Sequence, residues 1–217
     1  MTEILRKDAV DVETRLRELD LSIAELHEVA RAAYVAKAGC SPLHPPTYPG
    51  TAGWAAAVHT MRESKLPQGW RRADPGNFSI TINDAGRFYV VIATGDQLAG
   101  RSIGKPPTTK SPKGLKTEAA VRATRQLTLF PDEAFEALKR DAELAGYKAW
   151  FLLLNIAEGE VLLELSSPME MTKGKISSWH ERIIVPGISF DPSLKGVGEG
   201  DGGGFTPDID IDIQRVA

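Results

Sequence analysis

Residues 147–166, YKAWFLLLNIAEGEVLLELS, contain the pattern that decides our interpretation of the fold. The apolar run from Ala149 to Leu154 shows no alternation with polar residues, which is typical of a strand buried on both faces of a sheet. A turn-forming run, Ala157-Glu158-Gly159, follows, and the chain from Glu160 to Ser166 returns as a second strand. The stretch therefore predicts a β-hairpin whose first strand is fully buried.

The rest of the chain predicts further strands and a set of helices. Phe78, Ile80 and Ile82 alternate with polar residues, a turn follows at 83–86, and 87–94 is rich in β-branched and aromatic residues, so a second hairpin is expected there. The segment from Glu181 to Val185 predicts one more strand. Helices are expected at 11–38 in two pieces, with a capping box from Ser22 to Glu25 opening the second, and at 51–64, 117–129 and 132–145. This order favours an α+β fold with a mainly antiparallel sheet, built from two hairpins plus an extra strand, and with helices packed on one face.

Composition places the protein among ordinary globular chains. Of its 217 residues, 42% are hydrophobic and 25% are charged, and the formal net charge is −3. A single cysteine, Cys40, precludes an intrachain disulfide. The charged N-terminus and the lack of a long apolar run lead us to expect a cytoplasmic location and no membrane partner.

Beyond residue 190 the composition changes, which predicts a globular domain over 1–190 and a tail over 191–217. Six glycines crowd into 196–204, so a flexible linker is expected. The tail ends in an Ile-Asp alternation at 208–213, which would place isoleucines on one face of a strand and aspartates on the other. Residues 206–217 are therefore a candidate docking segment for a protein partner, through addition to a sheet edge.

Charge is distributed unevenly along the chain. Seven basic residues and one acid between Arg101 and Arg125 give a net charge of +6, whereas the segment from Phe190 to Ala217 carries −4. The first part of the basic segment belongs to a Gly- and Pro-rich loop at 95–114, and loops of that length are often functional. The candidate polyanion-binding residues are Arg101, Lys105, Lys110, Lys113 and Lys116. We therefore expect an accessory or interaction protein of a bacterial-type cytoplasm that contacts nucleic acid or another polyanion through residues 101–116. A basic loop that is merely solvated, or covered by the acidic tail, is the alternative that involves no partner.

Other functional interpretations remain open at this point. The chain could be an enzyme, hydrolase- or nuclease-like, acting on a phosphorylated or nucleic-acid substrate, with Asp96 or Glu164 as the acid and Arg101 as a phosphate clamp. A simpler role for Glu164 is a cross-strand ion pair with Arg182. No spacing of residues assigns a catalytic group, a metal site or a cofactor, and we expect neither metal nor cofactor.

Overall fold

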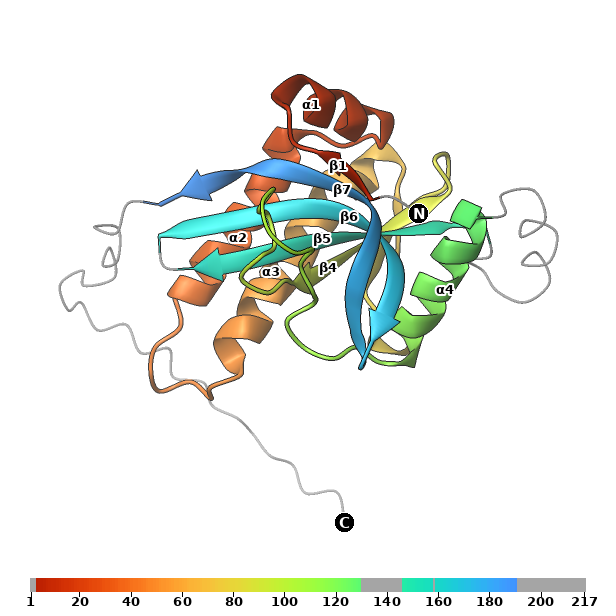
Figure 1. The fold of residues 1–217 in the computed structure, drawn as a ribbon. Coiled ribbons are helices and arrows are strands. Elements are labelled where there is room, and N and C mark those ends of the chain that lie inside the picture. Colours follow the sequence, from red (N-terminus) through yellow and green to blue (C-terminus); the bar gives the residue numbers. More distant parts are fainter. Residues whose placement is uncertain (1–2, 130–145, 158, 191–217) are drawn as a thin grey trace, which may run out of the picture.

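The computed structural model describes residues 3–129, 146–157 and 159–190, which form a seven-stranded sheet with helices against it (Figure 1). The sheet has the order β1-β7-β6-β5-β4-β3-β2. Its strands are β1 (Ile4–Arg6), β2 (Arg71–Ala73), β3 (Ile80–Asn83), β4 (Phe88–Thr94), β5 (Lys148–Ala157), β6 (Glu160–Thr172) and β7 (Lys175–Ser189). The helices are α1 (Ala9–Glu18), α2 (Ile23–Ala38), α3 (Tyr48–Lys65) and α4 (Leu115–Leu129), with short 3₁₀ turns at Leu66–Gln68 and Pro75–Asn77.

Strand β5 lies at the centre of the sheet, and the prediction that it is buried on both faces is confirmed. Its residues from Ala149 to Leu154 are all buried, and it is hydrogen-bonded to β4 on one side and to β6 on the other. Both predicted hairpins are present, as β3–β4 and β5–β6, and the extra strand is β7.

The sheet is mixed, so the prediction of a mainly antiparallel sheet is wrong. Strand β4 runs parallel to β5 over its whole length, and the short N-terminal strand β1 runs parallel to β7. The long connection from Thr94 to Lys148 contains α4, and a helix-containing crossover joins strands that run in the same direction. The two hairpins identified from sequence therefore meet through a parallel pair.

Helices cover both faces of the sheet, contrary to the prediction of one covered face. On one face, α1, α2 and α3 pack against one set of alternating side chains of the central strands, such as Ile92 of β4 and Leu152 of β5. On the other face, Ala120 and Val121 of α4 pack against the opposite set, such as Phe151. The connection that contains α4 begins at β4 and ends at β5. Helices α1–α3 already cover one face of these two strands, so α4 packs on the opposite face.

The β6–β7 hairpin extends beyond the rest of the sheet and bends toward α4 (Figure 1). Its register is irregular on both sides of Pro168, where the chain cannot donate a ladder hydrogen bond. The bend brings Ile176 and Trp179 into the core beneath α4. Trp179 is 3% exposed and packs in this core beside Phe151.

Helix boundaries follow local capping chemistry. Ser22 and Glu25 form the predicted capping box at the start of α2. Helix α3 begins at Tyr48 rather than after Thr51, because Pro49 occupies its first turn, where a missing N–H has no consequence. The helix expected at 132–145 and the tail at 191–217 lie outside the described residues.

Candidate nucleic-acid interface

The loop at 95–114 lies on the face of the sheet that α4 also covers, and it is closed at its base by Asp96. One carboxylate oxygen of Asp96 accepts a hydrogen bond from the Leu98 N–H at 2.9 Å. The other accepts from both the N–H and the hydroxyl of Thr108, each at 2.8 Å. Thr109 forms a β-bridge with Gly95. Asp96 is thus the residue that holds the two ends of the loop together.

A buried ion pair attaches the loop to the sheet. Glu164 of β6 is fully buried and Arg182 of β7 is 3% exposed, and the guanidinium donates two hydrogen bonds to the carboxylate, at 2.6 and 3.0 Å. The carboxylate also accepts from the N–H of Gly100, and the guanidinium donates to the carbonyl of Arg101. The predicted Glu164–Arg182 pair is confirmed, and it also holds the loop through its backbone.

These contacts bear on the enzyme interpretation. Both oxygens of Asp96 and of Glu164 already accept hydrogen bonds from the protein. The exposed Arg101 donates its Nε–H to the carbonyl of Gln97. None of these three residues lines either of two cavities that lie beside β4, so the geometry gives no support to a catalytic role for them.

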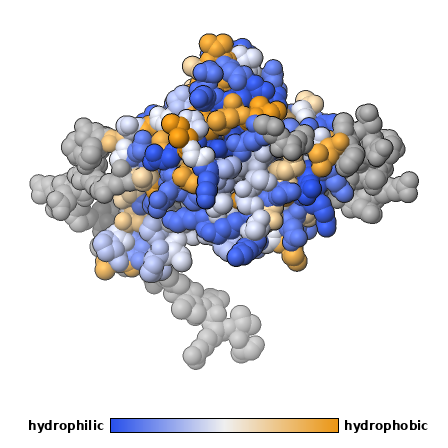
Figure 2. Space-filling model, in the orientation of Figure 1, coloured by the Kyte–Doolittle hydropathy of each residue, from blue (hydrophilic) through white to orange (hydrophobic). Residues whose placement is uncertain are grey.

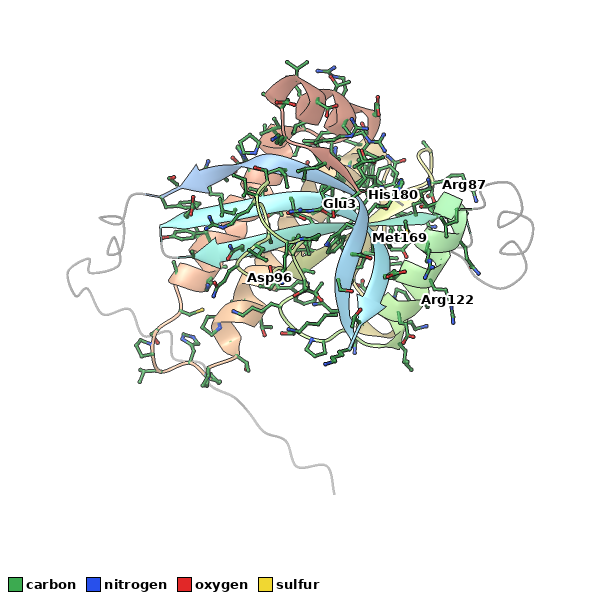
Figure 3. The ribbon with its side chains drawn as sticks, in the orientation of Figure 1. Glu3, Arg87, Asp96, Arg122, Met169 and His180 are labelled. Atoms are coloured by element: carbon green, nitrogen blue, oxygen red, sulfur yellow. The ribbon has the colours of Figure 1, made fainter. Side chains whose placement is uncertain are left out.

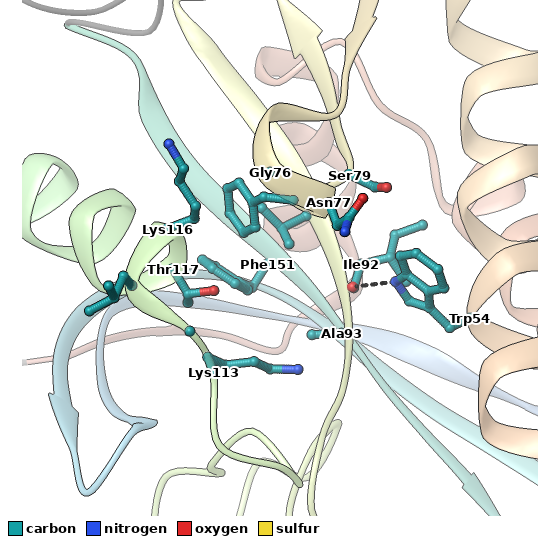
Figure 4. Close-up of a pocket in the computed structure, with 14 residues that line it drawn as sticks. Trp54, Gly76, Asn77, Ser79, Ile92, Ala93, Lys113, Lys116, Thr117 and Phe151 are labelled. Atoms are coloured by element: carbon teal, nitrogen blue, oxygen red, sulfur yellow. Dashed lines mark hydrogen bonds between the residues drawn. The ribbon is translucent and has the colours of Figure 1, made fainter. Parts of the chain in front are cut away.

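Two adjoining cavities form a groove along the outer edge of β4, which we call the β4 groove; Figure 4 shows the residues that line the smaller of the two. Their volumes are about 540 Å³ and about 780 Å³. Both are lined by Trp54, Ile92, Ala93 and Lys113, which stand at the junction between them. The smaller cavity continues toward the 75–79 turn and the start of α4, and the larger one toward the start of α3 and the end of α2.

The groove exists because β4 extends beyond its outer neighbour. Strand β3 pairs with β4 only over Phe88–Val90, so the following residues of β4 lack a strand on that side. Helix α3 borders the opening on one side and the segment 110–117 on the other. The indole N–H of Trp54 donates to the exposed edge at the carbonyl of Ile92, at 3.2 Å, and this fixes the ring at the groove.

Of the residues that the structure describes, four lysines line the β4 groove and no aspartate or glutamate does. Lys37 comes from α2, whereas Lys110, Lys113 and Lys116 come from the basic segment. Burial, and then the charge of Lys110, lower the pKa of Lys37, and burial lowers the pKa of Lys113. Among the described residues none of the four forms an ion pair with a carboxylate. Within residues 3–129, 146–157 and 159–190, the groove therefore carries positive charge that no carboxylate neutralises through an ion pair.

The structure divides the predicted polyanion-binding residues into two groups. Lys110, Lys113 and Lys116 meet at the groove, whereas Arg101 and Lys105 stand exposed on the loop and line neither cavity. Farther along the basic segment, Arg122 projects from α4 at a distance from Asp96 (Figure 3), and Arg125 pairs with Glu170 at 3.3 Å. The face that carries the loop is largely hydrophilic, with scattered apolar side chains (Figure 2).

Sequence reasoning missed two residues of the groove, Lys37 and Trp54. Both lie far from the basic segment in the chain, on helices whose sequences predict only packing against the core. Their participation depends on how α2 and α3 pack at the carboxyl end of β4, which no local pattern encodes.

Comparisons with known proteins leave this geometry as the basis for assigning a function. No protein-family model matches the chain, and neither a curated protein nor a solved structure does. Within residues 3–129, 146–157 and 159–190, no helix has the length and apolar character needed to cross a membrane. In the same ranges no group of three or more His, Cys, Asp or Glu side chains is placed to hold a metal ion. The proposed docking segment at 206–217 lies outside the described residues.

Proposed function

We propose that the protein is a non-catalytic accessory protein that binds nucleic acid or another phosphate polyanion in the β4 groove. The observation that carries this proposal is the set of four lysines, Lys37, Lys110, Lys113 and Lys116, in a groove whose described lining contains no acidic residue. Burial lowers the pKa of Lys37 and of Lys113, so these two ammonium groups are partly removed from water, and a bound polyanion stabilises their charged form.

The surroundings of the larger cavity also suit phosphate. It is lined by the first turn of α3, whose N-terminal end carries partial positive charge, and by the hydroxyl residues Thr51 and Ser111. It lies at the carboxyl ends of β4 and β5, and in open α/β sheets ligands bind outside the carboxyl ends of parallel strands. Serine and threonine hydroxyls and helix N-termini are common contacts to phosphate oxygens.

The test is the salt dependence of oligonucleotide binding, measured by fluorescence anisotropy with a labelled single strand. If all four lysines contact phosphates, the slope of log K against log salt is about −3, which is about a 50-fold loss of affinity between 50 and 200 mM salt. Replacing Lys110, Lys113 and Lys116 by Gln should reduce the slope to about −0.7, the value for one remaining contact.

A matched control removes the same charge elsewhere. Lys7 directly follows β1, and Arg17 and Arg31 lie on α1 and α2. All three are outside the groove, and their replacement by Gln alters the net charge equally. The control should keep the wild-type slope. Absence of binding at low salt, or an equal loss of slope in both triple variants, would refute the proposal.

A further inference from the structure

The two halves of the β4 groove differ in chemistry. The larger cavity is the more polar of the two, because it contains Lys37, Lys110 and the start of α3, although Leu154 and Ile156 also line it. The smaller one has an apolar floor formed by Val91, Ala93 and Phe151, with Phe78 at its side. Trp54 and Lys113 stand where the two halves join. A ligand that fills both halves must combine an anionic part with an apolar or aromatic part.

The apolar half also presents hydrogen-bonding groups. The side chains of Asn77 and Thr117 stand on opposite sides of it, and Lys113 extends along its border (Figure 4). In the described part of the chain the amide of Asn77 makes no side-chain hydrogen bond, although it can donate and accept. An alkyl chain offers these groups no polar atom, whereas a heteroaromatic ring has polar atoms at its edge that can pair with them.

We infer that the apolar half binds a nucleobase, so that the groove accommodates a nucleotide unit of a single-stranded nucleic acid. The base stacks on Trp54 with its polar edge toward Asn77 and Thr117, and the adjoining phosphates reach Lys113 and the polar half. This inference rests on the proposed function and adds the part of the ligand that the apolar half recognises. Bases in a duplex are already paired and stacked, so a single strand is the form that can place one there.

Tryptophan fluorescence offers a direct readout of base stacking. Trp54 is 38% exposed, whereas Trp70, Trp150 and Trp179 are 3–5% exposed, and these are the four tryptophans of the chain. A base stacked on Trp54 should quench the component of the emission that iodide can reach. Replacement of Trp54 by Leu should abolish that response.

The deciding experiment compares a short oligothymidylate with an abasic strand of the same length, which keeps the phosphates and lacks the bases. Stacking of one base is worth about 1–3 kcal/mol, so the oligothymidylate should bind at least about 5-fold more tightly to the wild-type protein. In Trp54→Leu the two strands should bind alike. Tyr48→Leu, an aromatic replacement on the same helix at a residue that does not line the groove, should keep the wild-type difference.

The remaining outcomes separate failure of the base site from failure of the proposed function. Equal affinity of the wild-type protein for both strands overturns the base site and leaves the proposed function intact, whereas no binding of either strand overturns both. Thymidine monophosphate binding as tightly as the strand overturns the single-strand assignment. If Trp54→Leu does not fold, Asn77→Gly provides the test, because glycine accommodates the positive φ of 62° at this position and lacks the amide. It should reduce the preference for the oligothymidylate without altering the affinity for the abasic strand.

Discussion

Replacing Glu164 by Gln should destabilise the protein strongly and release the loop at 95–114. The glutamate is fully buried and receives hydrogen bonds from four groups, namely two nitrogens of Arg182, the N–H of Gly100 and the hydroxyl of Ser166. Glutamine has the same shape but only one oxygen. Whichever way its amide is oriented, the NH₂ group faces two donors that previously had an acceptor.

The magnitude follows from those contacts. One of the two donors that lose their acceptor is the charged guanidinium. The other is either the Gly100 N–H or the Ser166 hydroxyl, and only the hydroxyl can rotate to accept from the NH₂ group. Removing one partner from a buried ion pair costs about 3–5 kcal/mol. Glu3 lies 3.4 Å from the same guanidinium and retains some compensation, so the lower half of that range is expected.

The assay is urea denaturation followed by circular dichroism, combined with hydrogen exchange of the Gly100 amide. The control is Glu170→Gln on the same strand, because Glu170 pairs with Arg125 at a half-exposed site, where an ion pair is worth at most about 1 kcal/mol. Glu164→Gln should lose about 3 kcal/mol of unfolding free energy and the protection of that amide. A loss below about 1 kcal/mol with protection retained would refute the reasoning.

Three other perturbations test the structure of the loop and the edge of the sheet. Gly100→Ala should destabilise by about 2–4 kcal/mol in the same assay, because φ is +77° and a Cβ would lie 2.6 Å from a backbone nitrogen of β6; wild-type stability would contradict this. Asp96→Ala should speed limited proteolysis within the loop and hydrogen exchange at the Thr108 amide, and unchanged rates would show that Asp96 does not close the loop. Burial opposes ionisation of Glu181, but hydrogen bonds from Arg15 and Arg6 hold the pKa of its carboxyl below 4.5. The ion pair therefore stabilises the protein above about pH 4.5, and this contribution is lost as the pH falls through the lowered pKa. Glu181→Gln should therefore lower stability at pH 7 and flatten its acid dependence, as measured by urea titrations at several pH values, and parallel pH profiles would contradict the assignment.

The local elements of this fold could be predicted because their signals are short in sequence. The unbroken apolar run of β5, the capping box at Ser22 and the turn at 83–86 each depend on a few adjacent residues. The direction in which β4 pairs with β5 depends instead on the path of the connection between them. Hairpin patterns carry no information about that path, and for this reason the parallel pair and the second helical layer were missed.

The candidate site also combines features that adjacent residues determine with features that depend on how distant segments pack. The charge of the basic segment is visible in the sequence, and three of its lysines do meet at one groove. Which basic residues converge depends on the loop contacts of Asp96 and Glu164, which direct Arg101 and Lys105 elsewhere. Lys37 and Trp54 join the site only through the packing of α2 and α3 beside the part of β4 that extends beyond β3.

The central claim is that nucleic acid occupies the β4 groove, and photocrosslinking tests it most directly. A single strand containing 4-thiothymidine would be bound at low salt, irradiated and digested, and the crosslinked peptides identified by mass spectrometry. Crosslinks should fall on Trp54, on the 76–79 turn and on 113–117, the segments that border the apolar half. Crosslinks confined to the exposed loop around Arg101 and Lys105, with none at the groove, would contradict the claim.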